Sequence, residues 1–428
     1  MGARIPVNLL SIGGSDPSGA SGIQGDVRTL GALGASCATA VTAVTAQNTG
    51  SFGGSEPVSP GMIGGQIRSV LADVRVSGIK IGMVWDEDGM EAVRRAVSGA
   101  GVPVVADPVA RSTTGGRLTR DPAAYARILA PVSDIMTPNL EEARAMTGTG
   151  DPARAAGRLL RMGARGVIVT GVRRGGSVRD LVFGGGRSEV AGGALRGAFR
   201  GAGGVHSAAL LHALASGDGP AAAARRAWRV ARDAIVHRHR PGAGLPVADA
   251  GAAARTLGEA ARSLAATDWM HSLIPECQTN FVYGIRPKGP SDVLGIEGRM
   301  VRAGRSVIMA GAIRYGGSAH VARALVAASS VYPSIRSAMN VRYGAAAAGR
   351  AGLVVAHYDR GEEPPGTGSS VSWGVEAAAS RSPRRPDAVC HAGAHGKEPM
   401  MIILGTSPAD VAAKAALIHK YRAAGRGP

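Results

Sequence analysis

The sequence predicts a doubly wound α/β fold for roughly the first 240 residues, followed by a separate second domain. Apolar segments of strand length alternate with helical segments, polar residues follow several strands, and a glycine turn opens directly into a helix. Because parallel strands are joined by helical crossovers, this alternation is typical of one sheet with helices on both faces. We expect strands at residues 7–12, 38–45, 78–83, 102–107 and 134–137, and helices at 60–71, 88–97 and 123–129.

The composition is that of a globular protein with more than one domain. The chain has 428 residues, of which 45% are hydrophobic, so disorder throughout is excluded. It contains 64 glycines and only 4% aromatic residues, which indicates cores of Ala, Val, Leu and Ile with many tight turns.

The formal net charge of +18 is compatible with nucleic acid, an anionic membrane surface or phosphorylated small molecules as partners. The arginines are spread along the chain, without an aromatic RNA-binding signature or a zinc-finger spacing, so we expect no nucleic-acid partner. No apolar run is long enough to span a membrane, and we expect no membrane partner. Cys37, Cys277 and Cys390 lie far apart and fit neither a disulfide framework nor a metal site, so we expect a reducing cytoplasmic location.

Polar residues follow the first two strands. The strand at 7–12 runs into Gly13-Gly14-Ser15-Asp16, and Asp26 lies at the start of the next helix. The second strand delivers Gln47 and Asn48 to its carboxyl end, where open α/β sheets bind ligands. Loop capping is the structural alternative for Gln47.

Three further polar residues follow later strands. Asp107 ends an apolar strand, where a carboxylate can face a metal or a nucleotide, although a helix N-cap is the alternative. Asn139 and Glu142 begin a helix after Pro138, and this spacing also satisfies an ordinary capping box. No direct protein ligation of a metal is predicted.

The glycine turn at 200–207 is a candidate anion hole. Backbone N–H groups of Gly201, Gly203 and Gly204 can converge on a phosphate oxygen, and the dipole of the helix that continues through 208–215 adds positive potential. A plain strand-to-helix connection is the alternative.

With these segments in place, residues 5–240 resemble the hydroxymethylpyrimidine/phosphomethylpyrimidine kinase family, which is ribokinase-like. The resemblance implies that Asp26 and Gln47 bind the aminopyrimidine, that Asp107, Asn139 and Glu142 organise ATP with Mg2+, and that the glycine turn holds the transferring phosphoryl group. It rests on Gly13-Gly14-Ser15-Asp16, Gly22-Ile23-Gln24-Gly25-Asp26, Val44-Thr45-Ala46-Gln47-Asn48-Thr49, Lys80-Ile81-Gly82-Met83, Asp107-Pro108-Val109, Thr137-Pro138-Asn139-Leu140-Glu141-Glu142-Ala143 and the turn Gly201-Ala202-Gly203-Gly204.

The chain departs from that family at two places. Gly204 stands where the family has a cysteine and the related sugar kinases have an aspartate, so the position offers no base. His206 is no evident replacement, because two residues along a helix correspond to a rotation of about 200° and its ring should point away from the face that presents the turn. Thr170-Gly171-Val172-Arg173 replaces a more glycine-rich, lysine-bearing nucleotide segment.

A domain boundary is expected after Pro241-Gly242-Ala243-Gly244. The expected organisation is a kinase-like domain at 1–245, a linker with a helical segment at 246–268, and a second domain at 269–425. From Leu273 the sequence resembles the archaeal-type thiamine-phosphate synthase family, with an α/β (α+β) domain. The matching blocks are Thr279-Asn280-Phe281-Val282-Tyr283, Gly295-Ile296-Glu297-Gly298-Arg299-Met300-Val301-Arg302, Tyr315-Gly316-Gly317-Ser318-Ala319-His320-Val321-Ala322-Arg323, Ala338-Met339-Asn340-Val341-Arg342-Tyr343, Ser372-Trp373-Gly374-Val375-Glu376 and Gly396-Lys397-Glu398-Pro399-Met400.

The residue types in these blocks suit a reaction that expels pyrophosphate. Arginine matches phosphate oxygens with a forked set of donors, so Arg299 is a candidate clamp, with Arg302 and Arg342 in support. His320, at the start of a helix, can donate to the leaving anion or protonate it. The resemblance implies that Arg299 and His320 are the functional pair and that Asn340 and Lys397 contact ligands. Solvated arginines and a capping histidine are the alternative.

The function expected from both resemblances is thiamine biosynthesis. The second domain would join hydroxymethylpyrimidine diphosphate to thiazole phosphate, and the first would be an ATP-dependent pyrimidine kinase impaired by Gly204. The alternative is a non-catalytic thiamine-phosphate sensor whose first half is a pseudokinase. We expect small-molecule substrates and a homo-oligomer.

Overall fold

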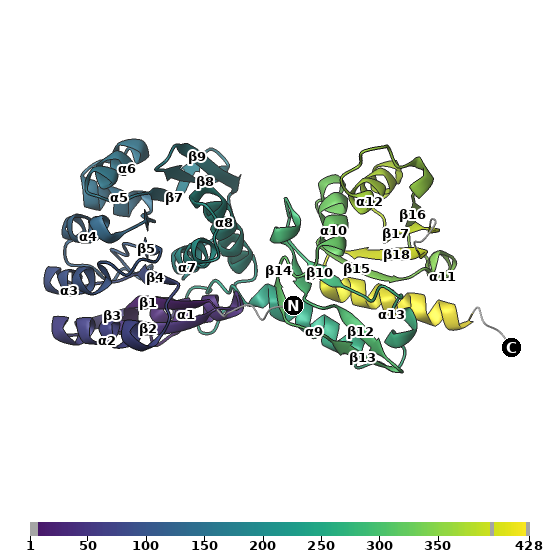
Figure 1. The fold of residues 1–428 in the computed structure, drawn as a ribbon, viewed down its shortest axis with the longest axis horizontal. Coiled ribbons are helices and arrows are strands. Elements are labelled where there is room, and N and C mark those ends of the chain that lie inside the picture. Colours follow the sequence, from purple (N-terminus) through teal and green to yellow (C-terminus); the bar gives the residue numbers. More distant parts are fainter. Residues whose placement is uncertain (1–6, 394–397, 425–428) are drawn as a thin grey trace. The chain divides into compact units, whose positions relative to one another are not determined.

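The computed structural model describes residues 7–393 and 398–424 and divides into two compact units, Met1–Ala252 and Ala253–Pro428. Each unit has its own sheet and its own helices (Figure 1). Within the described residues, no helix is long and apolar enough to cross a membrane.

The first unit is built on a nine-stranded sheet in the order β3-β2-β1-β4-β5-β6-β7-β8-β9. Strands β2, β1, β4, β5, β6 and β7 run parallel, whereas β3, β8 and β9 are antiparallel additions at the two edges. The strands are β1 (Asn8–Ser15), β2 (Ser36–Gln47), β3 (Phe52–Pro57), β4 (Gly78–Ile81), β5 (Val104–Ala106), β6 (Ile135–Met136), β7 (Val167–Arg174), β8 (Ser177–Phe183) and β9 (Arg187–Gly193).

Helices cover both faces of this sheet. Helices α1, α7 and α8 pack together, and α2 to α6 form a second group in which each helix contacts the next (Figure 1). The helices are α1 (Gly22–Ala32), α2 (Pro60–Asp73), α3 (Glu87–Val97), α4 (Pro122–Leu129), η1 (Ala130–Val132), α5 (Leu140–Thr147), α6 (Pro152–Arg161), α7 (Ala202–Ala215) and α8 (Pro220–Val236).

The predicted doubly wound architecture is confirmed, and its reason is visible in the central strands. Leu9, Leu10 and Ile12 of β1 are fully buried although neighbouring residues face opposite sides of the sheet, as expected of a strand covered on both faces. Strand β1 lies between β2 and β4, so the winding reverses there and opens a crevice at the carboxyl ends of the strands. The expected strands omit β3, β7, β8 and β9. Strands β3 and β9 are rich in glycine and polar residues and lack an apolar signal, whereas β7 and β8 carry buried apolar residues that the expectation overlooked.

The second unit contains a seven-stranded sheet in the order β14-β11-β10-β15-β18-β17-β16, with a two-stranded hairpin β12-β13. Neighbouring strands are antiparallel except β16 and β17. The strands are β10 (Phe281–Tyr283), β11 (Leu294–Ile296), β12 (Met300–Ala303), β13 (Ser306–Met309), β14 (Ile313–Tyr315), β15 (Ser337–Arg342), β16 (Val355–His357), β17 (Ala388–His391) and β18 (Met400–Gly405). The helices are α9 (Ala252–Ala265), η2 (Met270–Leu273), η3 (Pro290–Asp292), α10 (His320–Val331), α11 (Ala345–Arg350), η4 (Arg360–Glu362), α12 (Ser370–Arg381) and α13 (Pro408–Ala424).

Alternate residues of this second sheet serve two separate cores. In β15, Met339 and Val341 pack with α9, α11 and α13, while Ala338 packs with α10 and α12 on the other face. This period of two is that of a strand whose two faces are both covered. The second unit is therefore a three-layer α/β structure.

Helix α9 lies inside the segment 246–268 that the sequence suggested as a linker. Its residues Leu257, Ala261 and Leu264 are buried in the core of the second unit. On the other side of the division, Pro246 and Ala248 make backbone hydrogen bonds to Arg200. The connection between the units is thus shorter than the expected linker, because an alanine-rich helix with a buried face belongs to a core.

Candidate active sites

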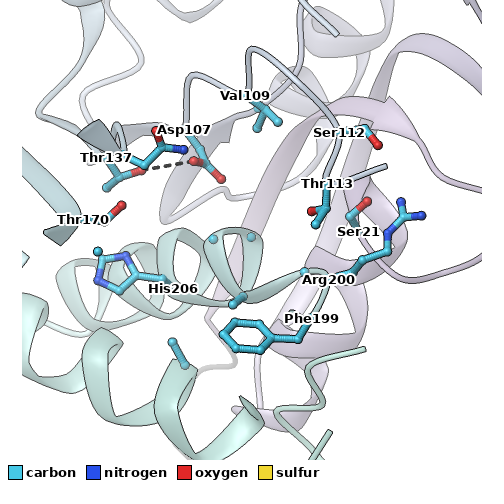
Figure 2. A pocket seen from close by; sticks show the side chains of 18 of the residues that line it. Ser21, Asp107, Val109, Ser112, Thr113, Thr137, Thr170, Phe199, Arg200 and His206 are labelled. Atoms are coloured by element: carbon cyan, nitrogen blue, oxygen red, sulfur yellow. Dashed lines mark hydrogen bonds between the residues drawn. The ribbon is translucent and has the colours of Figure 1, made fainter. Parts of the chain in front are cut away.

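The first unit holds a cavity of about 450 Å³ where the carboxyl ends of β1, β2, β4, β5 and β6 meet (Figure 2). Every kinase-site residue expected from the sequence lines it: Asp26, Gln47, Asp107, Asn139, Glu142, Gly201, Gly203 and Gly204. These residues are far apart in the sequence. The sheet brings them together because its parallel strands present their carboxyl ends along one edge.

The glycine turn forms the start of helix α7. Gly201 is the N-cap with φ of 83°, a left-handed conformation that favours glycine, and a side chain there would collide with the carbonyl oxygen of Ala20. Because the first N–H groups of a helix have no partner within it, those of Ala202, Gly203 and Gly204 are available to an anion. The geometry is that of an anion hole.

A buried ion cluster lies next to this turn. The ammonium of Lys80 in β4 is 2.6 Å from Asp26 Oδ1 and 3.6 Å from Asp107 Oδ2. Ser11 Oγ donates a hydrogen bond to Asp26 Oδ2 at 2.6 Å. Burial alone would lower the pKa of Lys80, but the two carboxylates raise it above its ordinary value, so the lysine is a cation at neutral pH. Burial raises the pKa of Asp26, and Lys80 opposes that rise.

Asp107 does not cap a helix, which was the structural alternative for it. Its Oδ2 accepts a hydrogen bond of 2.7 Å from Ser207 Oγ on α7, and its Oδ1 lies 3.4 Å from Thr137 Oγ1, the contact dashed in Figure 2. Asp107 is 6% exposed. It therefore sits between the ion cluster, the anion-hole helix and the cavity.

Asn139 and Glu142 form the capping box that was the alternative for them, and they also line the cavity. Asn139 Oδ1 accepts from the Glu142 N–H and Glu142 Oε2 accepts from the Asn139 N–H, each at 2.9 Å. Burial and the carboxylate of Asp107 raise the pKa of Glu142 to about 8. A cation bound between Asp107 and Glu142 would relieve this repulsion.

Gln47 is held by an arginine that the expected set omits. Arg200 is 2% exposed, and its Nη2 donates to Gln47 Oε1 at 2.7 Å and lies 3.3 Å from Asp16 Oδ2. Gln47 Nε2 donates to Thr45 Oγ1 at 3.0 Å. The amide is thereby fixed in orientation at the wall of the cavity.

Lys80 and Arg200 are therefore site residues that the expectation missed, although the sequence carries a signal for each. Lys80 is a charged residue between Ile79 and Ile81 in a fully buried strand, where lysine is rare without a partner. Arg200 directly precedes the glycine turn. Ser207 carries no such signal, because a serine within a small-residue helix is common.

His206 leaves the face of α7 that presents the glycine turn, as expected, and yet it lines the cavity. The ring does leave the face of α7 that carries Gly204 and Ser207, but the cavity extends along a second side of the helix, which His206 and Thr170 line (Figure 2). His206 Nε2 lies 3.0 Å from Asp180 Oδ2 on β8. The ring is rotated away from the face of α7 that carries Gly204, as the helical geometry requires. It still lines the cavity, because the cavity extends around the helix to that side.

In the second unit, Arg299 and the segment 277–280 form a strained arrangement. Arg299 has φ of 74° and Gln278 has φ of 65°, both in the left-handed region that non-glycine residues seldom occupy. Arg299 Nη1 donates to the Cys277 carbonyl oxygen, and the Arg302 N–H donates to Gln278 Oε1 at 2.9 Å. The hairpin that carries both arginines is thus tied to this segment.

Asn340 holds the same segment from the sheet. Its Oδ1 accepts from the Asn280 N–H at 2.6 Å, and its Nδ2 donates to the Gln278 carbonyl oxygen at 2.9 Å. Asn340 is 3% exposed, so both polar ends are engaged within the protein. Lys397 lies outside the described residues.

Glu398 is a further residue that the expected set omits. It accepts from the backbone N–H groups of Glu276 and Cys277 at 3.1 and 3.0 Å. Burial raises its pKa, but these donors and the guanidinium of Arg342 outweigh burial and lower the pKa below its ordinary value. Arg342 is thereby placed beside the segment that Arg299 contacts.

His320 is the first residue of helix α10, and several arginines act on it electrostatically. Partial desolvation lowers the pKa of the imidazole, and the guanidinium groups of Arg360, Arg299 and Arg323 lower it further. Arg323 and Arg360 are absent from the expected set. A concentration of positive charge around a neutral histidine favours an anionic ligand, whose charge the arginines would balance.

Two family models match the chain. The model described as phosphomethylpyrimidine kinase matches residues 16–248, and the model described as thiamine-phosphate synthase ThiN matches residues 256–416. Thiamine-phosphate synthase ThiN of Methanothermobacter thermautotrophicus is 36% identical over 35% of this chain and 84% of that protein.

Two further similarities extend over longer stretches. The bifunctional thiamine biosynthesis protein ThiDN of Methanocaldococcus jannaschii is 26% identical over 96% of this chain and 98% of that protein. The structure of pyridoxal kinase from Staphylococcus aureus in complex with AMP-PCP has a TM-score of 0.53 and 25% identity, covering 58% of this chain and 95% of that one.

Proposed function

Because the chain belongs to the phosphomethylpyrimidine kinase family in its first unit and to the thiamine-phosphate synthase ThiN family in its second, we propose that it carries consecutive steps of thiamine biosynthesis. The first unit transfers a phosphoryl group from ATP to the pyrimidine. The second joins the pyrimidine diphosphate to thiazole phosphate and releases pyrophosphate. The substrates are small molecules, and the chain is expected to work in the cytoplasm. It is also expected to form a homo-oligomer, and sedimentation measurements check this oligomeric state.

One observation carries the kinase assignment. The N-terminus of α7, the Lys80 ammonium and the Asp107 carboxylate converge on one cavity at the carboxyl edge of the sheet. Phosphoryl transfer depends mainly on positioning and on stabilising charge on the transferred group, and helix N–H donors with a buried cation supply both.

The residues present also fit a nucleotide with Mg2+. Asp107 and Glu142 both line the cavity, and burial, with a contribution from the Asp107 carboxylate, raises the pKa of Glu142 to about 8. Mg2+ is commonly held by one or two carboxylates together with substrate phosphates. When bound, it would neutralise charge on the phosphates. Asp107 and Glu142 would hold it, and the first N–H groups of α7 would orient the transferred phosphoryl group.

Gly204 makes the two phosphorylations unequal. The first phosphorylation must activate a neutral alcohol, whereas in the second the attacking group is a phosphate oxygen that is already anionic at neutral pH. Gly204 provides no side chain to accept the proton of the alcohol. The chain therefore acts chiefly on the pyrimidine monophosphate.

For the synthase step, Arg299 and its neighbours bind the leaving pyrophosphate. Arg299, Arg323 and Arg360 all act on His320 electrostatically, so their charges are concentrated around it. A diphosphate bound there is stabilised as it separates from the pyrimidine methylene, which lowers the barrier to attack by the thiazole nitrogen. His320, once an anion is bound, donates a proton or a hydrogen bond to the departing oxygen.

The second candidate is a sensor of thiamine phosphate whose kinase half is inactive. The absence of a side chain at Gly204 favours it.

One experiment separates the two functions. The purified full-length chain is supplied with thiazole phosphate, ATP and Mg2+, together with the pyrimidine alcohol, monophosphate or diphosphate in separate reactions. Thiamine phosphate from the diphosphate and from the monophosphate supports the proposal. Thiamine phosphate binding without formation of any product contradicts it and supports the sensor.

A further inference from the structure

Asp180 connects two parts of the kinase cavity that are far apart in the sequence. Its Oδ1 accepts a hydrogen bond of 2.9 Å from the Gly171 N–H, and its Oδ2 lies 3.0 Å from His206 Nε2. Gly171 belongs to a bulge in β7, with φ of 68°, and lines the cavity together with Thr170. His206 lies on α7, two residues after Gly204 in the glycine turn. Asp180 therefore bridges the β7 bulge and the anion-hole helix.

Both side chains of this bridge are buried, and some of their polar atoms lack a hydrogen bond. Asp180 is 2% exposed and His206 is 5% exposed. Among the described residues, His206 is the sole ion-pair partner of Asp180, and neither Asp180 Oδ2 nor either ring nitrogen of His206 has an aligned hydrogen bond. Buried polar groups without an aligned partner cost free energy, so a small rotation of the ring that aligns the 3.0 Å contact is favourable.

We propose that His206 and Asp180 are positioning residues of the nucleotide site, which hold the Thr170–Gly171 bulge in register with the anion hole of α7. The inference rests on the proposed kinase function of this cavity. The bulge and the first turn of α7 line the same cavity, so a nucleotide that contacts both needs them at a fixed separation. The pair fixes that separation because Asp180 on β8 accepts from the Gly171 N–H of the bulge and faces His206 on α7.

The pairing also accounts for the burial of the Asp180 carboxylate. A buried carboxylate needs a compensating donor or cation, and Asp180 accepts one backbone N–H and lies 3.0 Å from the imidazole of His206.

The test is ADP binding to the full-length chain by calorimetry, which does not depend on kinase turnover. We expect His206→Leu and Asp180→Asn each to weaken ADP binding about tenfold, the loss typical of one hydrogen bond to a charged group. His206→Gln keeps an N–H donor near the place of Nε2 and should bind ADP within about threefold of the wild type. The double variant His206→Leu/Asp180→Asn should be no weaker than either single variant, because the two residues act as one pair.

A matched control lies on the same helix. His212 is also buried but does not line the cavity, so His212→Leu tests for general destabilisation. It should leave ADP affinity unchanged even where the melting temperature falls.

The outcomes distinguish the inference from the function on which it rests. Wild-type chain that binds no ADP contradicts the proposed kinase function itself. Wild-type binding that persists in His206→Leu and Asp180→Asn overturns the inference alone. Equal losses in His206→Leu and His206→Gln, or additive losses in the double variant, also overturn it, because packing rather than the pair would then be responsible.

Discussion

A side chain built at Gly204 would point at Lys80: its first carbon would lie 3.9 Å from the Lys80 ammonium and 3.7 Å from Asp26 Oδ1. The glycine therefore leaves space directly above a buried cation that the α7 anion hole also faces. The chain keeps the charge-stabilising part of a phosphoryl-transfer site while lacking a base at this position.

We predict that the two phosphorylations proceed at unequal rates. The chain should phosphorylate the pyrimidine monophosphate at a measurable rate and the free alcohol at least about 10²-fold more slowly, the usual contribution of general-base catalysis. Steady-state rates on both substrates with saturating ATP test this. Equal, robust rates would contradict it and would mean that another residue, with His206 the first to examine, accepts the proton.

We predict that Gly204→Cys restores part of the first phosphorylation. The new thiol would lie near the Lys80 ammonium, which favours its thiolate form, and near Asp26 Oδ1, which opposes it and can take up its proton. The measurement is the rate on the free alcohol, relative to that on the monophosphate. Gly203→Cys is the matched control, because a Cβ at Gly203 would lie within 4 Å of neither Lys80 nor Asp26. A gain of similar size in both variants would exclude the specific role of position 204.

We predict that Arg299→Ala or His320→Ala lowers thiamine phosphate formation about 10²- to 10³-fold, because each variant removes a donor to the leaving pyrophosphate. Turnover at saturating pyrimidine diphosphate measures the effect, with circular dichroism as the folding check. Arg314→Ala is the control: this arginine pairs at 3.3 Å with Glu297 and is not among the groups that act on His320. Wild-type turnover in Arg299→Ala and His320→Ala would remove both residues from the mechanism.

Pyrophosphate binding should be coupled to proton uptake by His320. Desolvation and the surrounding arginines lower the pKa of His320, so near pH 6.5, its ordinary value, the free protein holds it mostly neutral. A bound anion offsets the arginine charges and raises the pKa, so that protons are taken up and binding tightens as the pH falls from about 8 to about 6. Calorimetry in buffers of different ionisation enthalpy measures this uptake.

The control for the proton-uptake experiment uses another histidine of the second unit. The pKa of His419 is also lowered, first by burial, but none of the arginines around His320 contributes to that shift. His320→Asn should lose the additional uptake and His419→Asn should retain it. Identical uptake in wild type and His320→Asn would show that His320 does not respond to the anion.

We predict that the second unit makes thiamine phosphate from preformed pyrimidine diphosphate when separated before α9. A fragment that begins at Ala250 keeps Leu257, Ala261 and Leu264 in its core, whereas one that begins at Thr267 loses all three. The longer fragment should fold and turn over, and the shorter one should not fold. Thermal unfolding and product formation check both. A folded longer fragment that requires the first unit for this reaction would contradict two independent units.

Several features of the first unit followed from the sequence. Apolar segments alternating with helices determined the doubly wound fold, because buried parallel strands need apolar residues on both faces. The motif blocks determined the family of each half, and both assignments are confirmed. The polar residues placed after strand ends, such as Gln47 and Asp107, line the cavity because parallel strands share one carboxyl edge.

Other features depend on contacts between segments that no local pattern encodes. Lys80 is 54 residues from Asp26, and Arg200 is 153 residues from Gln47, so their pairing exists only once the sheet and α7 are assembled. The helical rotation of His206 was foreseen, but its position at the cavity depends on where β8 carries Asp180. The sequence alone determined the fold class, the two families and the absence of a side-chain base at position 204. Tertiary structure decided which charges meet, because a side chain's partner is set by the packing of distant elements and not by its neighbours along the chain.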